Sequence, residues 1–271
     1  MRTRILDKKK IMKLMLDLTK DLDVDPVPNL RRVALRNKIP YTTAWRIAEG
    51  LRTREWGLIH AVPSFKSLNL KLLHVIFKPV DNWLEKAKKF NYKRFIAEGF
   101  GKGGKRGMIA FYCTEDLLEE HLEAVNKNLG DILSYGTYTY IVPNKPRIEL
   151  IDNPITYDVL EGLDIVYEPK EPLITKYDKL DLMILTELQK QGLLRVVELA
   201  DLVKSSRKVV EYRLRRRVKH LIEGYSLKFI YDRKVPLTMY LMKGPNAKKL
   251  TRFSALPVPV TVYMSDDSTI V

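Results

Sequence analysis

Three helix-forming segments lie close together between residues 180 and 225, and this run constrains the fold more than any other part of the chain. The first segment carries leucines at helical spacing and ends at Gly192. The second is a short apolar repeat, and Ser205 or Ser206 can cap the third helix by accepting a bond from its free amides. A strand-like run, SLKFIYDR, follows where a wing should lie. This order predicts a winged helix-turn-helix.

The third segment, SRKVVEYRLRRRVKHLIEG, separates into two faces when its residues are placed about 100° apart. The apolar stripe consists of Val210, Leu214, Val218 and Leu221. A charged helix face is often merely solvated, but here the excess has one sign and lies on the third helix of the unit. Lys and Arg neutralise phosphates, and Arg can also bond two guanine edge atoms. The predicted DNA contacts are therefore Ser206, Arg207, Lys208, Tyr212, Arg215, Arg216 and Lys219.

The same stretch carries a more specific pattern. The first helix-forming segment matches the pattern L-D-x-x-I-L-x-x-L-Q-x-x-G through Leu180, Asp181, Ile184, Leu185, Leu188, Gln189 and Gly192. E-L-A and R-R-V-x-x-L-x-x-x-G are matched by Glu198, Leu199 and Ala200, then by Arg216, Arg217, Val218, Leu221 and, one residue early, Gly224. These residues resemble the DNA-binding half of Lrp/AsnC-type transcription regulators. The family's usual glycine between the second and third helices is replaced here by Val203-Lys204-Ser205-Ser206.

The amino terminus repeats this three-helix outline. Asp7 is the expected cap of a helix through IMKLMLDLTKDL, Asn29 opens LRRVALRNK, and Thr42 or Thr43 is the expected cap of a third helix. The inward stripe of that third helix is Ala44, Ile47, Ala48 and Leu51. Its predicted DNA contacts are Tyr41, Thr42, Thr43, Trp45 and Arg46, while an alternative places Trp45 in a small core. Two such units indicate an internal duplication.

Residues between the two units follow the order β-α-β-β-α-β, which predicts a ferredoxin-like sandwich. In Lrp/AsnC proteins a domain of this order dimerises or binds small effectors, so the resemblance implies a homodimer or a small-molecule effector. The tail after residue 232 starts the cycle again and stops about halfway. The predicted fold class is α+β, with winged helices at 1–65 and 177–232, a ferredoxin-like domain at 66–145, a proline-containing connector at 146–176 and a truncated half-domain at 233–271.

Charge and cysteine usage indicate the partner and compartment. The net charge is +15 and the isoelectric point is near 9.6, which favours a polyanion, either nucleic acid or a membrane surface. No apolar run is long enough for a transmembrane helix and no signal-peptide core is evident, so we expect a cytoplasmic, nucleoid-associated protein without membrane contact. The lone Cys113 in an apolar strand fits a reducing compartment and a place in the core.

Motifs for catalysis, metals and cofactors are weak. His60, His74, His121 and His220 have no metal-ligand spacing. The run from Gly99 to Gly107 satisfies G-x-G-x-x-G by letter, but a strand follows it instead of a helix, so it predicts a β-hairpin. Its cations, Lys102, Lys105 and Arg106, are either solvated or contact an anion, and Asp266-Asp267 lacks a third carboxylate. We therefore expect no enzyme, no metal and no cofactor.

These observations predict a sequence-specific regulator of transcription that binds double-stranded DNA. If the two units are related by a pseudo-two-fold, one chain reads two half-sites. A homodimer through the middle sheet is the other way to present symmetric sites. A non-regulatory DNA-binding module, such as a replication initiator or an RNA polymerase accessory factor, is the alternative, and a nuclease or transposase is disfavoured by the missing carboxylate triad.

Overall fold

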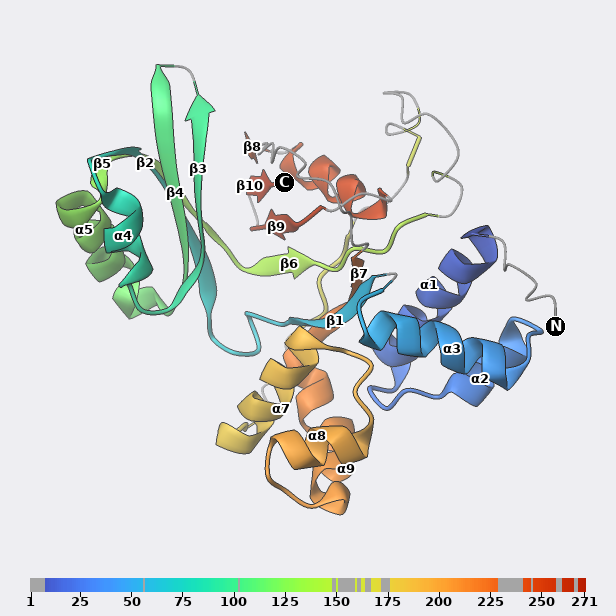
Figure 1. The fold of residues 1–271 in the computed structure, drawn as a ribbon. Helices are drawn as coiled ribbons and strands as arrows, with labels where there is room; N and C mark the ends of the chain where they lie inside the picture. The colour runs from blue at the N-terminus through green and yellow to red at the C-terminus, as the bar shows by residue number, and fades with distance from the viewer. Residues whose placement is uncertain are drawn as a thin grey trace. The chain divides into compact units, whose positions relative to one another are not determined.

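The fold is described from a computed structural model, shown as a ribbon in Figure 1. The structure describes residues 8–55, 57–101, 103–147, 150, 159, 162–163, 167–171, 176–228, 241–244, 246–256, 260–265 and 268–271. Asp7, Lys102, Asp266 and Asp267, which figure in the sequence predictions, lie outside these residues, as does much of the connector. The chain divides into two units, residues 65–140 and the remainder on both sides.

The amino-terminal helices follow the predicted order. They are α1 (Lys8–Val24), α2 (Leu30–Arg36) and α3 (Tyr41–Arg52), followed by β1 (Leu58–Pro63). Asn29 caps α2 as expected, because its side chain accepts a bond from the Arg32 amide at 3.0 Å. The predicted cap of α3 at Thr42 or Thr43 is wrong. Pro40 occupies that position, in an extended conformation that places Tyr41 in the first turn.

The second set of helices comprises α7 (Lys179–Lys190), α8 (Val196–Leu202) and α9 (Arg207–Arg216). Ser206 caps α9 as predicted, with its hydroxyl accepting from the Val209 amide at 3.3 Å. The helix is shorter than the sequence pattern indicates, because a 3-10 turn, η3 (Val218–Leu221), follows it and leads into β7 (Ile222–Lys228). All four residues of the predicted apolar stripe are buried.

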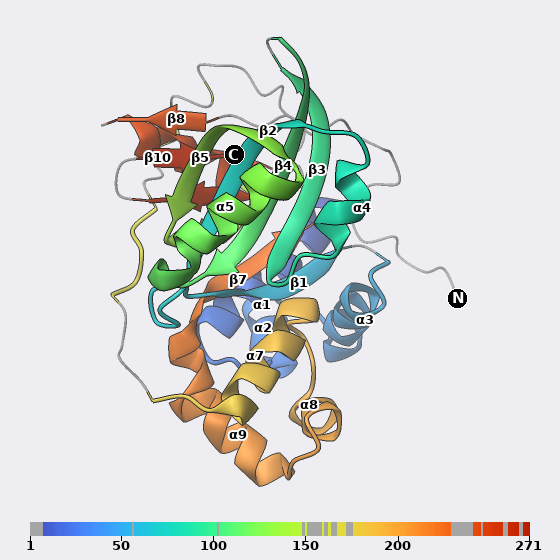
Figure 2. The same ribbon diagram turned by 90° about the vertical axis from the view of Figure 1, so that its left-hand side faces the viewer.

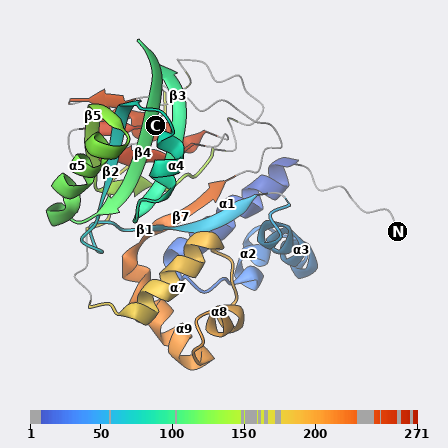
Figure 3. The ribbon, with the colours of Figure 1, turned by 60° about the vertical axis from the view of Figure 1, so that its left-hand side comes forward.

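The first three residues of the run expected to form a wing, 226–228, pair across the chain instead, and the rest of that run, 229–233, lies outside the described residues. β7 runs antiparallel to β1, with Ile59 opposite Leu227 and Val62 opposite Gly224, and Figure 3 shows the two strands side by side. The Gln191 side chain donates to the backbone oxygens of Leu51 and Arg52 at 3.2 Å each. The two helical units are thus joined into one compact unit, in which their strands form a shared two-stranded sheet.

The middle unit is a ferredoxin-like sandwich, as the sequence order predicts. Its sheet has the order β3-β4-β2-β5, and all of its pairings are antiparallel. The elements are β2 (Lys71–Pro79), α4 (Trp83–Lys88), β3 (Lys93–Gly101), β4 (Gly104–Cys113), η1 (Glu115–Leu117), α5 (Leu118–Asn128) and β5 (Gly130–Tyr138). Figure 2 shows α4 and α5 on one face of this sheet, and the core between them includes Val75, Phe77 and Phe111.

A third sheet, of four short strands, contains the carboxyl-terminal strands. Its order is β6-β9-β10-β8, so β6 (Tyr140–Val142) completes a sheet whose other strands come from the tail. Those strands are β8 (Leu241–Lys243), β9 (Val262–Met264) and β10 (Ser268–Ile270), and the tail helix is η4 (Ala247–Ala255). The predicted last strand of the sandwich is therefore divided between two sheets.

Candidate nucleic-acid interface

Helix α9 presents the face that the sequence pattern predicts. The seven predicted contact residues on and beside α9 are all exposed, and Tyr212 is 63% exposed. Val209 lies among them and is 40% exposed. A face with an aromatic ring, an apolar side chain and several cations can contact both phosphates and bases.

Most cations on this face are not neutralised by carboxylates. Among the residues that the structure describes, Arg207, Lys208, Arg216 and Lys219 have no ion pair. Arg215 differs, because its guanidinium lies 2.7 Å from Asp25 and 3.5 Å from Glu211. The unpaired cations can bind phosphate without first losing an internal partner.

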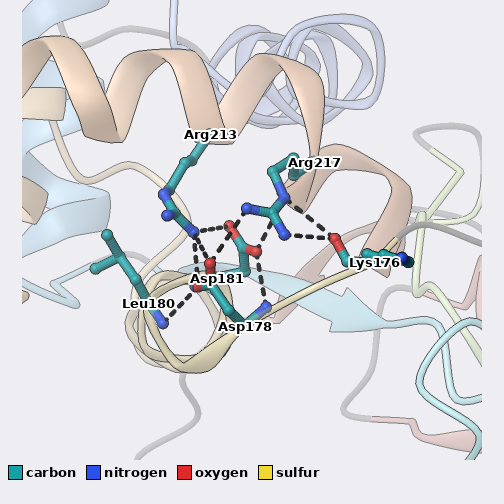
Figure 4. A network of polar contacts seen from close by, with 6 residues as sticks. All are labelled: Lys176, Asp178, Leu180, Asp181, Arg213 and Arg217. Carbon is teal, nitrogen blue, oxygen red and sulfur yellow. Dashed lines mark hydrogen bonds and ion pairs between the residues drawn. The ribbon is translucent and has the colours of Figure 1, made fainter.

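Two arginines, one in α9 and one directly after it, are structural instead, and sequence reasoning missed this role. Figure 4 shows Arg213 and Arg217 reaching the start of α7, where they contact Asp178 and Asp181. The Arg213 guanidinium lies 2.6 Å from Asp178 and 3.0 Å from Asp181, whose side chain is completely buried. The hydrogen bond from Arg213 is the largest cause that lowers the pKa of Asp178 to about 2.

The same carboxylates also cap α7. The Asp178 side chain accepts from the amides of Leu180 and Asp181, and the Asp178 amide donates to Asp181 at 3.0 Å. The aspartate at the cap and the arginines of the third helix were visible in the sequence. Their pairing was not, because it depends on how α9 crosses α7.

Not all of the predicted DNA contacts on α3 are exposed, in contrast to those of α9. Tyr41, Thr42, Trp45 and Arg46 are exposed, while Thr43 is partly buried. Trp45 is 48% exposed, so the alternative that placed it in a small core is wrong. The predicted inward stripe of α3 is fully buried.

Tyr41 and Trp45 line a groove of about 520 Å³ that also contains Arg207 and Arg215 of α9. A reading helix must project into the DNA major groove, which is about 12 Å wide. The two rings face a hollow that they share with two arginines of α9. The DNA contacts on α3 remain a prediction.

The other residues singled out in the sequence have structural surroundings. Cys113 is buried in β4, and burial raises the pKa of its thiol. His74 is buried beside the rings of Phe95 and Tyr138, and desolvation lowers its pKa to about 4. The glycine-rich run forms the β3–β4 hairpin, as expected, in which Lys105 pairs with Glu98 at 2.9 Å.

Metal ligands do not gather anywhere in the described part of the chain. Within it, no group of three histidine, cysteine or acidic side chains lies close enough to hold a metal ion. Every helix in the described ranges is too short or too polar to cross a bilayer.

Comparison with known proteins adds information about the fold. No family model matches the chain, and no curated protein matches it. A solved structure of the siroheme decarboxylase NirDL is similar at a TM-score of 0.52 and 12% identity, over 97% of this chain and 81% of that one. The same enzyme in complex with an iron-uroporphyrin III analogue is similar at a TM-score of 0.53, 12% identity and the same coverage. A third structure, PH0061, has a TM-score of 0.33, which is too low to support an argument.

These matches correct one expectation. The fold over nearly the whole chain is shared with an enzyme, which contradicts the exclusion of enzymatic activity drawn from the sequence. That prediction depended on missing metal, nucleotide and carboxylate motifs, and their absence excludes only the reactions that need them. At 12% identity the comparison shows the fold alone.

Proposed function

We propose that this protein is a sequence-specific, double-stranded DNA-binding regulator of transcription, and that α9 is its main reading helix. The observation that carries the proposal is the exposed face of α9. It combines four cations that have no ion pair among the described residues with the exposed rings and methyl groups of Tyr212 and Val209. A solvated helix face needs no such aromatic and apolar side chains.

The support of α9 agrees with this role. Arg213 and Arg217 hold the helix against α7, and its apolar stripe is buried, so the reading face projects from a fixed base. Contacts to phosphates then set the position of the helix, and contacts to base edges provide specificity. Lys208 and Arg216 are suitable for either role.

The antiparallel pairing of β1 with β7 supports a second part of the proposal. Two paired antiparallel strands are related by a local two-fold axis, and the same axis applied to the helices before them would make the two helical units the halves of a pseudo-dimer. One chain would then contact two half-sites. A footprint confined to one short half-site with a monomeric protein would contradict this arrangement.

Selection from a pool of random duplexes tests the function. We expect the wild-type protein to enrich a defined motif at two salt concentrations, and Lys208→Ala/Arg216→Ala to lose that enrichment. The control is Lys86→Ala/Lys89→Ala, which removes two exposed cations on and beside α4 and leaves α9 intact. Salt-sensitive binding without a motif, equal in both variants, would contradict sequence-specific reading by α9.

A second candidate function follows from the fold comparison. The similarity to siroheme decarboxylase covers 97% of this chain, and one of the matched structures contains an iron-uroporphyrin III analogue. Decarboxylation of a tetrapyrrole is therefore a reaction to test. Mass spectrometry after incubation with siroheme would detect loss of carbon dioxide. Product formation without any enriched DNA motif would replace the regulator proposal with this one.

A further inference from the structure

The groove between α3 and α9 has a strongly cationic lining. Five arginines and one aspartate face its volume of about 520 Å³, which is within the range of about 300–1,000 Å³ typical of small-molecule sites. The arginines are Arg31, Arg52, Arg195, Arg207 and Arg215. A lining with this excess of positive charge favours an anionic occupant.

Internal partners leave part of this charge available. Arg52 pairs with Glu49 at 3.2 Å and Arg195 with Glu198, while Arg215 pairs with Asp25, the one aspartate of the groove. Arg31 and Arg207 have no ion pair among the described residues. These two guanidiniums can each bind an oxyanion through two parallel hydrogen bonds.

Two aromatic rings provide a second kind of contact. Tyr41 and Trp45 lie one helical turn apart on α3, and each is 48% exposed. The Arg31 guanidinium lies 5.9 Å from the centre of the Tyr41 ring, so one face of that ring is occupied by a cation. Trp45 is the ring better placed to stack on a planar group.

We propose that this groove binds a nucleoside phosphate, with the base on Trp45 and the phosphate on Arg31 and Arg207. A nucleoside phosphate contains both groups that this lining can bind: a flat aromatic ring, which can stack on Trp45, and an oxyanion, which can accept two hydrogen bonds from a guanidinium. Inorganic phosphate would leave Trp45 unused, and an uncharged ring would leave the guanidiniums unused. The site goes beyond DNA reading and shares Arg207 with the proposed reading face, whereas Lys208 and Arg216, the residues changed in the DNA test, do not line the groove.

Calorimetric titration of the full chain with ATP tests the site in the absence of DNA. We expect saturable binding that Trp45→Ala weakens about tenfold or more, because stacking on an aromatic side chain contributes strongly to base binding. Trp45→Phe keeps a ring and should stay within about threefold of wild type. Arg207→Gln should weaken binding about tenfold, since it removes a charge-assisted bidentate contact.

Arg46→Gln is the matched control, because Arg46 is exposed on the same helix and does not line the groove. Its affinity should equal that of wild type. Inorganic triphosphate should bind more weakly than ATP, and Trp45→Ala should not change its affinity. The proposal is overturned if Arg46→Gln weakens ATP as much as Arg207→Gln does, or if Trp45→Ala leaves ATP binding unchanged. It is also overturned if iron-uroporphyrin III binds through Trp45 while ATP does not.

Discussion

Replacing Arg213 by glutamine should loosen the attachment of α9 to α7 by an amount that the geometry allows us to work out. Asp181 is buried completely, and its carboxylate has three partners at 3.0–3.2 Å: Arg213, Arg217 and the Asp178 amide. Removing the only partner of a buried charge costs about 3–5 kcal/mol. Because Arg217 and the amide remain on Asp181, and the Asp178 carboxylate that Arg213 also contacts is exposed, we expect the lower cost typical of a hydrogen bond to a charged group, about 2–3 kcal/mol.

The assay is hydrogen exchange of the backbone amides of α7 and α9, which reports the opening free energy of these helices without requiring the whole chain to unfold in one step. A loss of about 2–3 kcal/mol corresponds to a decrease in protection of about 30- to 150-fold. The matched control is Lys190→Gln, since Lys190 is 59% exposed and pairs with Glu187 on the same helix. An exposed pair contributes about 0–1 kcal/mol.

Two outcomes would refute this reasoning. One is an Arg213→Gln protein whose α7 and α9 amides exchange no faster than those of Lys190→Gln. The other is a decrease in protection confined to the middle unit, residues 65–140, which contains neither helix. The first would mean that the buried carboxylate does not depend on Arg213. The second would mean that the damage is not local.

Three further predictions concern pH and backbone conformation. Burial lowers the pKa of His74 to about 4, so in a nuclear magnetic resonance titration its ring signals should change with a midpoint near pH 4. Because the unfolded chain takes up this proton near pH 6.5, the free energy of unfolding should fall by up to about 3 kcal/mol as pH drops from 6.5 to 4. A midpoint near 6.5 would contradict the burial of this ring. Asp178 has its pKa lowered from 3.8 to about 2, so its contribution to stability is complete above pH 3.8 and is lost as pH falls through 2; acid unfolding of Asp178→Asn should lack this loss, and an unchanged profile would argue against the pairing. Gly130→Ala should lower the midpoint of thermal unfolding by more than Gly99→Ala, because the backbone φ of Gly130 is +137° and a Cβ there would lie 1.9 Å from the Lys78 oxygen, whereas nothing lies within 4 Å at Gly99; equal midpoints would contradict this close approach of the backbone at Gly130.

Local patterns predicted the helices well. The buried stripe of α9 and the exposed cations opposite it follow from helical periodicity alone, which depends only on neighbouring residues. Ser206 was one of two predicted caps, because a hydroxyl directly before a helix can accept a hydrogen bond from a free amide of its first turn. The cap of α3 was missed because Pro40 can begin a helix without a side-chain bond, which leaves Thr42 and Thr43 inside it.

Pairings between distant residues were not predictable from these patterns. The residues of β7 have the composition of a strand, but nothing in them identifies β1 as the partner, so a local wing was the simpler prediction. The contacts of Arg213 and Arg217 with Asp181 arise only when α9 crosses α7. The groove lined by Trp45 and Arg207 likewise requires both helical units to be folded together.

The exclusion of enzymatic activity failed for a different reason. Motif searches recognise reactions that need particular residues at particular spacings, and a fold can support other chemistry without them. The likeness to a decarboxylase over 97% of the chain leaves catalysis to be tested directly. DNA reading and catalysis make separate predictions, so one does not have to fail for the other to hold.

The most direct test of α9 as a specific reader is the affinity for the selected duplex and for a scrambled duplex, measured over a range of salt concentrations. We predict that wild type prefers the selected duplex, and that Lys208→Ala/Arg216→Ala loses affinity with a salt slope smaller by about 1–2. Lys86→Ala/Lys89→Ala should behave as wild type. Equal affinity of wild type for both duplexes, or equal losses in the two double variants, would contradict specific reading by α9.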